Sequence, residues 1–329
     1  MNTIKERDSY FDNLKFLLIA LVVIGHTIEP MTSSGTIQFL YILIYLFHMP
    51  LFSFVTGYFS KRYSPTKLLQ NVAIPYIVFQ LLYFLFTRYV LGNIFITLSF
   101  FTPYWIMWYL LSLLMWQLVV PMFQFRYSII VAILIGILAG YDNSVSYFFS
   151  LSRTIYFFPF FLIGYKFNKD WFFNLMPIKP RTIISILGLI GVSIGVYNLS
   201  DNIDLRLLYG SYSYTSMNLT IWYAGVYRLL LYAITTIISI FILYIVPSRT
   251  TFFTVFGSKT LNVYLLHGFL IKLMVGHNFY TYFNEDYKKV SLIIIGFAIT
   301  YLLSTSFFNY ILKPLYIISL DKLYNYPKV

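Results

Sequence analysis

The chain has 329 residues, of which 59% are hydrophobic, 22% are aromatic and only 10% are charged. A soluble domain carries about 25% charged residues, so this composition excludes a conventional soluble core. The chain has no cysteine, which excludes disulfides, thiolate metal sites and a cysteine nucleophile. The net charge is +12, but the basic residues are scattered between apolar runs, as residues that set membrane topology are. We therefore expect no nucleic-acid partner.

Ten apolar segments are long enough to cross a bilayer, and they predict an all-α, polytopic bundle of about ten transmembrane helices. We expect a single integral membrane domain over residues 1–329, with a core at about 7–312, no appended soluble domain and a multi-pass location in the cell membrane. The fifth segment is short for a span and the eighth is long. The segments are residues 11–30, 37–59, 68–90, 104–124, 127–141, 146–165, 182–199, 218–246, 260–276 and 290–312.

Lysine and arginine are distributed unequally between the two sets of predicted loops. Sixteen of them fall in loops on the side of the amino terminus, and three fall on the opposite side. Because cytoplasmic loops are enriched in basic residues, this asymmetry predicts that both termini are cytoplasmic.

The first apolar segment joins a charged start to a histidine inside the span. Lys15 and His26 are eleven positions apart, so in a helix they share one face and lie about 16 Å apart along the axis. His26 would then lie about halfway through a hydrocarbon core roughly 30 Å thick. A basic topology anchor and a structural histidine are the plain alternatives, but ionisable groups inside membranes tend to be functional.

Four cations fall inside predicted spans, where hydrocarbon makes a charge costly. Arg88 and Lys272 lie near span ends, and we expect them to reach an interface. Arg153 and Arg228 lie deeper, and a ligand with phosphate or carboxylate groups would give them a partner. Backbone carbonyls or a water-filled cavity are the alternative partners.

The remaining histidines give weaker signals. His48 and His267 each lie in an apolar segment, where a single histidine is more often a structural hydrogen-bonding group than a catalyst, and His277 is expected at the surface. No two histidines have the spacing of metal ligands, so we expect no metal site.

Five motifs are spread along the chain. They are RDSYFDNLK at 7–15 with the basic-x10-His relation of Lys15 and His26, FHMPLF at 47–52, TGYF at 56–59, FFPFF at 157–161 with Gly164, and YLLH at 264–267. These motifs resemble those of the acyltransferase-3 family of integral membrane acyltransferases, and within it the fucose 4-O-acetylase branch. The resemblance covers most of the chain, from about residue 7 to 312, and is most specific in the first two helices.

The resemblance implies ten spans, cytoplasmic termini, and transfer of an acyl group, usually acetyl from acetyl-CoA, to a hydroxyl of a cell-envelope sugar. The implied partners are acyl-CoA, a sugar acceptor and the lipid bilayer. Many members carry an aspartate in the second helix, where this chain has Pro50 and no acid. What orients His26 therefore cannot be carried over from those members.

The chemistry of O-acetylation suggests a role for each candidate residue. A base must take the proton of a sugar hydroxyl, and a neutral imidazole suits this task, so we expect His26 to be the base. Without cysteine, direct transfer is the first choice and an acyl-histidine on His26 the alternative. Arg153 or His48 would stabilise charge on the carbonyl oxygen, and His267 and Arg228 are candidates for substrate binding. The donor phosphates would meet Lys15, Lys61, Arg62 and Lys67.

Two other functions fit the composition. A transporter or flippase of a lipid-linked glycan would also use buried arginines and an intramembrane histidine, although no matched pair of broken helices is found in the two halves. An accessory scaffold of an envelope synthesis complex is the third alternative. Acyl-CoA turnover by the purified protein would separate the enzyme from both.

Overall fold

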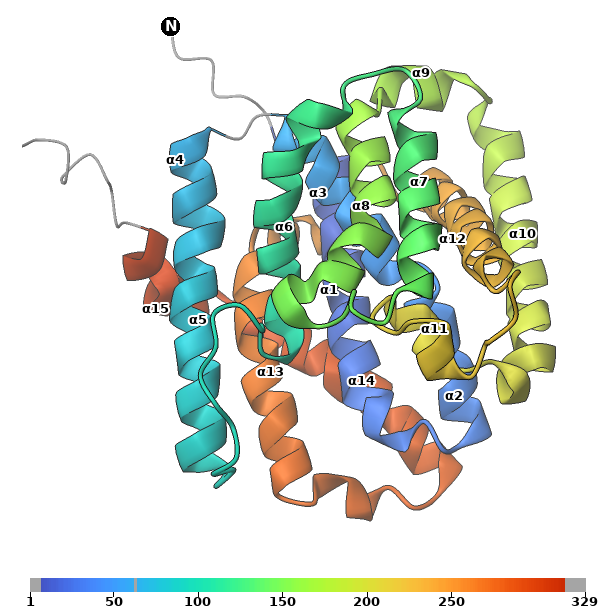
Figure 1. Ribbon diagram of the computed structural model, residues 1–329. Helices are drawn as coiled ribbons and strands as arrows, with labels where there is room; N and C mark the ends of the chain where they lie inside the picture. Colours follow the sequence, from blue (N-terminus) through green and yellow to red (C-terminus); the bar gives the residue numbers. More distant parts are fainter. Residues whose placement is uncertain (1–6, 62–63, 317–329) are drawn as a thin grey trace, which may run out of the picture.

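The computed structural model describes residues 7–61 and 64–316, with side chains described up to residue 312, and its regular elements in these ranges are all helical. The helices form one bundle, with α1 in its interior (Figure 1). They are α1 (Ser9–Ile28), α2 (Gly35–Tyr45), α3 (His48–Ser60), α4 (Pro65–Leu68), α5 (Ile74–Leu85), α6 (Trp108–Val119), α7 (Ser128–Leu138), α8 (Leu151–Lys166), α9 (Lys169–Asn174), α10 (Ile178–Leu199), α11 (Arg206–Tyr209), α12 (Gly225–Ile245), α13 (Thr260–Gly276), α14 (Asp286–Leu303) and α15 (Ser306–Tyr316).

Within the described ranges, seven helical segments are long and apolar enough to cross a membrane, and α14 with α15 makes an eighth that is bent by 58°. Two shorter apolar helices, Ser128–Tyr141 and Thr260–Gly276, cover two further predicted segments. The prediction of an all-α polytopic membrane bundle is confirmed. The number ten and the cytoplasmic location of the termini stay predictions.

One predicted segment is wrong at its start. The segment 218–246 was expected to be a single long span, but α12 begins only at Gly225. Asn218 has a left-handed backbone (φ 63°), and the amide of Leu219 turns back to the carbonyl of Tyr214. Hydropathy alone does not register this turn, because most of the residues between it and the start of α12 are apolar.

Helix α1 is tied to the rest of the bundle at its beginning. Asp8 caps the helix by accepting a hydrogen bond from the amide of Tyr10. The buried Asn13 donates to the carbonyls of Pro247 and Arg249 and accepts from the hydroxyls of Thr251 and Thr254. These bonds fix the beginning of α1, and the helix packs against α2, α3, α13 and α14.

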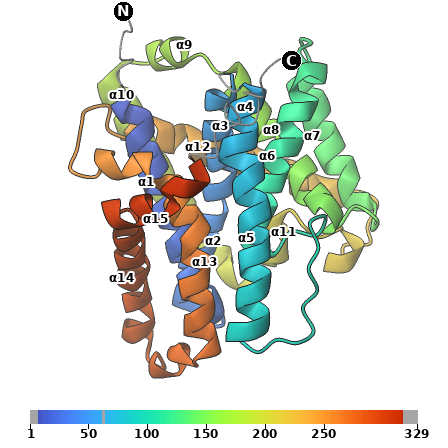
Figure 2. The same cartoon turned by 90° about the vertical axis from the view of Figure 1, so that its left-hand side faces the viewer.

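The bundle has two ends that organise the site. Helix α1 begins at the same end as α4 and α9, which we call the amino end (Figure 2). The connections between α7 and α8, between α10 and α12, and between α13 and α14 belong to the opposite end, which we call the far end. Helix α14 runs back from the far end toward the amino end.

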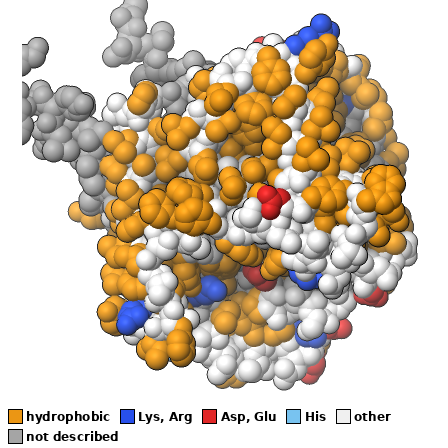
Figure 3. All heavy atoms as spheres, in the orientation of Figure 1, with side chains coloured by type: hydrophobic (Ala, Val, Ile, Leu, Met, Phe, Trp, Pro, Cys, Tyr) orange, Lys and Arg blue, Asp and Glu red, His pale blue; other side chains and the backbone are white. Residues whose placement is uncertain are grey.

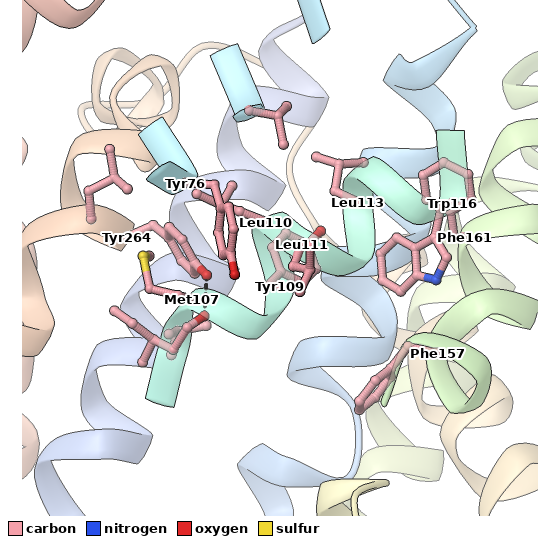
Figure 4. Packing of buried hydrophobic residues seen from close by; sticks show 14 of the residues in the cluster. Tyr76, Met107, Tyr109, Leu110, Leu111, Leu113, Trp116, Phe157, Phe161 and Tyr264 are labelled. Carbon is pink, nitrogen blue, oxygen red and sulfur yellow. Dashed lines mark hydrogen bonds between the residues drawn. The ribbon is translucent and has the colours of Figure 1, made fainter. Parts of the chain in front are cut away.

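The core includes a layer along α6. Tyr109, Leu110 and Trp116 are buried there, and Trp116 donates its indole N–H to the carbonyl of Thr154 on α8. Figure 4 shows Tyr264 of α13 reaching the start of this helix, where its hydroxyl donates to the carbonyl of Ile106. Helix α6 is therefore held between α8 and α13.

The outside of the bundle is apolar. Of the residues of α10, only Ser185 and Val196 are buried, and most of its isoleucines and leucines are exposed. Figure 3 shows hydrophobic side chains over the upper part of one face and a whiter, more polar surface over the lower part. An exposed apolar surface of this extent is the lipid-facing surface of a multi-pass membrane protein.

Candidate active site

His26 lies in the last turn of α1, next to a carboxylate. Its Nδ1 is 3.0 Å from Oε2 of Glu29, and the hydroxyl of Tyr45 on α2 is 3.2 Å from the same nitrogen. Glu29 is three residues further along, so the helical path places it on the same face. Nε2 of His26 has no hydrogen-bond partner among the described residues, and the side chain is 16% exposed.

Sequence reasoning did not single out Glu29 and so missed this pairing. The signal that would have found it is the i,i+3 spacing of a histidine and a glutamate at the end of a span. A carboxylate bound to Nδ1 fixes the tautomer and the ring orientation and leaves Nε2 free to accept a proton.

Aromatic rings surround the imidazole of His26. The centroid of the Trp105 ring lies 4.7 Å away, and the ring of His267 stacks at 5.6 Å. His267 is fully buried on α13, where its Nδ1–H donates to the carbonyl of Val263 and its Nε2 has no hydrogen-bond partner in the described chain. The structure thus brings His267 against His26, although it does not line the cavity described next.

A cavity of about 220 Å³ opens beside His26. It brings together three of the predicted site residues, His26, His48 and Arg153, which come from α1, α3 and α8. Aromatic side chains supply much of the remaining wall. The other lining residues are Glu29, Tyr45, Met49, Trp105, Ile106, Trp108, Tyr147, Phe157, Leu208, Tyr209 and Tyr212.

Arg153 lines this cavity without forming an ion pair with a described residue, although Glu29 lines the same cavity. Its guanidinium lies over the rings of Trp108 (5.2 Å) and Tyr147 (5.6 Å), and it has no hydrogen bond or ion pair with a described residue. The preceding residues Phe149 and Ser150 have left-handed backbones (φ 53° and 50°), an uncommon conformation that tends to occur at functional sites. The strained turn before α8 therefore positions a cation with unused donors at the cavity wall.

His48 begins α3 and is also buried. Its Nδ1 is 2.8 Å from the carbonyl of Ile44, so a neutral ring donates there and leaves Nε2 as an acceptor. A neutral His48 therefore has no second proton to donate into the cavity. This geometry favours Arg153 over His48 as a donor to a developing oxyanion.

A second cavity, of about 290 Å³, lies toward the amino end, and residues of α1, α3, α6 and α13 line most of it. Lys15 lines it, together with Thr56, Asn71, Tyr109 and Tyr264 among others. The ammonium of Lys15 is 2.7 Å from a carboxylate oxygen of Asp12 and lies over the ring of Phe59.

The other predicted donor-binding residues are less directly connected to this cavity. Lys61 donates to the carbonyl of Phe167, on the side of α3 that faces α8 and α9. Lys67 is exposed on α4. Arg62 lies outside the described residues. Lys15 is therefore the predicted donor-binding residue that the structure places on a cavity wall.

The structure places Arg228 away from both cavities. Its guanidinium is buried between the rings of Tyr156 and Tyr214 and donates to the carbonyls of Gly136 and Tyr212. This is the backbone-bonded alternative considered for a buried arginine. Arg228 connects α7 to the loop that follows α11.

Comparison with known proteins identifies the family. The sequence profile of the acyltransferase domain called acyltransferase 3 matches residues 8–309. The chain belongs to this family. It is also similar to the nodulation protein NolL of Mesorhizobium japonicum, with 44% identity over 59 residues, a stretch that covers 17% of this chain and 16% of that protein. No solved structure matches the chain. The region matched by the family profile includes the residues that line both cavities.

Proposed function

We propose that this acyltransferase moves an acetyl group from acetyl-CoA to a hydroxyl of a cell-envelope glycan, as in the fucose 4-O-acetylase branch of the family. The observation that carries the proposal is the pairing of His26 with Glu29 at a cavity that also holds the unpaired guanidinium of Arg153. A base and an electrophilic donor at one cavity are what acyl transfer to a hydroxyl needs.

The reaction follows from these positions. Nε2 of His26 takes the proton of the acceptor hydroxyl while the hydroxyl oxygen attacks the carbonyl carbon of the thioester. Glu29 accepts the Nδ1–H bond and stabilises the imidazolium. Arg153 donates to the carbonyl oxygen as negative charge develops. The C–S bond then breaks, and the thiolate of coenzyme A takes the proton from the His26 imidazolium and leaves as the thiol. The new ester remains on the acceptor.

The donor would enter from the amino end. Residues of α1, α3 and α6 line both the cavity at Lys15 and the cavity at His26, which lies further along α1. Tyr109 and Tyr264 line the Lys15 cavity, and the Tyr264 hydroxyl donates to the carbonyl of Ile106, which lines the His26 cavity. A phosphate group near Lys15 and a thioester near His26 would place the long arm of coenzyme A along this path.

The test uses the purified full-length chain in lipid nanodiscs with acetyl-CoA labelled in the acetyl group. We expect label to move onto an extracted envelope glycan and coenzyme A to be released in equal amount. A protein that binds the glycan but releases no coenzyme A, with or without acceptor, would contradict the proposal.

A further inference from the structure

A polar groove at the far end of the bundle joins the cavity of His26. It has a volume of about 450 Å³ and is built from two segments, residues 143–147 before α8 and residues 211–216 after α11. Tyr147 and Tyr212 line both the groove and the His26 cavity. A molecule in the groove would therefore have a direct path to the reacting atoms.

The groove is fixed by bonds from several elements. Arg228 and Ser152 hold the carbonyls of Tyr212 and Gly210, at 3.1 and 2.7 Å. The amide of Tyr214 donates to the carbonyl of Gly140, just before the first segment, and the hydroxyl of Ser213 donates to Oδ1 of Asn143, which ties the two segments together. A loop held in this way is a preformed surface, which lowers the entropic cost of binding.

Arg206 braces the open side of the groove. Its guanidinium donates to the carbonyl of Ser216 and is paired with Asp204. This hydrogen bond from Arg206 lowers the pKa of Asp204, so the pair stays ionised at neutral pH. Arg206 and Asp204 neutralise one another in this pair, and neither side chain lines the groove.

The lining has the chemistry of a site for an uncharged polyol. Among the described residues that line it, none is charged, and most carry a hydroxyl or an amide. Asn143 accepts from Ser213 and Thr215 through Oδ1, and its amide N–H groups have no described partner. The rings of Tyr147 and Tyr212 stand at 88° to one another where the groove meets the cavity. Hydroxyls, a free amide and tyrosine faces suit the O–H groups and the C–H face of a sugar.

We infer that this groove is the acceptor subsite and that it takes a neutral sugar, with the reacting hydroxyl directed between Tyr147 and Tyr212 toward His26. The inference rests on the proposed acetyl transfer. It adds where the acceptor binds and that the bound sugar residue is uncharged.

The test exploits the absence of cysteine from the chain. Ser216→Cys places one thiol at the exposed rim of the groove, and Thr281→Cys places a matched thiol at the far end between α13 and α14. Each full-length variant is purified into nanodiscs and modified with a bulky polyethylene-glycol maleimide. Acetylation of extracted envelope glycan and hydrolysis of acetyl-CoA are then measured on the same samples.

Modification of Ser216→Cys should lower the ratio of glycan acetylation to acetyl-CoA hydrolysis at least tenfold, and modification of Thr281→Cys should leave that ratio within twofold. An unchanged ratio in modified Ser216→Cys, or an equal fall in the Thr281→Cys control, would overturn the acceptor subsite. An unmodified protein that does not turn over acetyl-CoA at all would instead refute the proposed function.

A second arm tests the charge of the sugar. Neutral p-nitrophenyl hexosides and 6-deoxyhexosides are compared with the corresponding hexuronides as acceptors. We expect acetylation within the neutral set only. Preference for the hexuronides, or acetylation of none of the neutral glycosides by a protein that hydrolyses acetyl-CoA, would overturn the assignment to a neutral sugar.

Discussion

In the proposed mechanism, Glu29 gives His26 the partner that a general base needs. Relatives in the family often carry an aspartate in the second helix, but this chain has Pro50 in that region. The carboxylate of Glu29 instead comes from the same helical path as the histidine, 3.0 Å from Nδ1. A carboxylate at this distance holds the ring and favours the protonated state that forms during transfer.

The Glu29→Gln variant should keep the fold and lose catalysis. Glutamine can still accept the Nδ1–H bond, but it cannot stabilise the imidazolium by charge. We expect kcat to fall by at least about tenfold with little change in KM for acetyl-CoA, because the loss is in the transition state. Full kcat in Glu29→Gln would remove the carboxylate from the mechanism.

Lys15→Ala tests the donor cavity. Loss of this ammonium should raise KM for acetyl-CoA roughly 5- to 20-fold, about the worth of one charge-assisted hydrogen bond. Lys179→Ala on α10, at the same end of the bundle and exposed, is the matched control. Equal KM values for both variants would show that Lys15 does not bind the donor.

At the scale of elements, the close packing of α3 on α8 sets the distance between His48 and Arg153 along the cavity wall. Gly57 of α3 faces the carbonyl of Phe161, and Gly164 of α8 faces the carbonyl of Phe54. A methyl group at either glycine would run into backbone, so the two helices approach one another only because both residues lack a side chain.

Gly164→Ala should therefore push α8 away from α3. We expect destabilisation of about 1–3 kcal/mol, typical of overpacking, and reduced acyl transfer because Arg153 shifts with its helix. Thermal unfolding in detergent measures the first effect. Gly191→Ala on α10 is the control, since a methyl there meets no atom within 4 Å, and its melting temperature should not fall. An equal melting temperature for Gly164→Ala and wild type would contradict the packing account.

At the scale of the whole molecule, the proposed reaction would run along one path from the amino end to the far end of the bundle. The cavity at Lys15, the cavity at His26 and the polar groove lie in that order, and Tyr147 and Tyr212 line both the His26 cavity and the groove. With the amino end in the cytoplasm, the path would connect a cytoplasmic donor with an outer acceptor.

That direction depends on the topology predicted from the basic residues. Reporter fusions at residue 1 and at residue 329 should both report the cytoplasm, because sixteen of the basic loop residues lie on that side and three on the other. A signal from the opposite face of the membrane, for either fusion, would contradict the proposed path.

The sequence alone predicts the bundle because each span is an unbroken apolar run, and a bilayer leaves helices as the main option. It also predicts His26, Arg153 and His48 as candidates, because an ionisable side chain is costly inside hydrocarbon and tends to have a function there. It does not predict Glu29, because an acid after a span reads as a loop residue. Nor does it predict the groove of residues 143–147 and 211–216, whose two segments meet only through long-range packing.

The central claim is that His26 is the base, and His26→Gln tests it most directly. Glutamine can hydrogen-bond to Glu29 or Tyr45, but it cannot take a proton at neutral pH. We predict a loss of acetyl transfer of at least about 10²-fold at unchanged thermal stability, measured on purified protein beside His48→Ala and His267→Ala. Activity of His26→Gln within about tenfold of wild type, above all if His48→Ala or His267→Ala is inactive, would contradict the account.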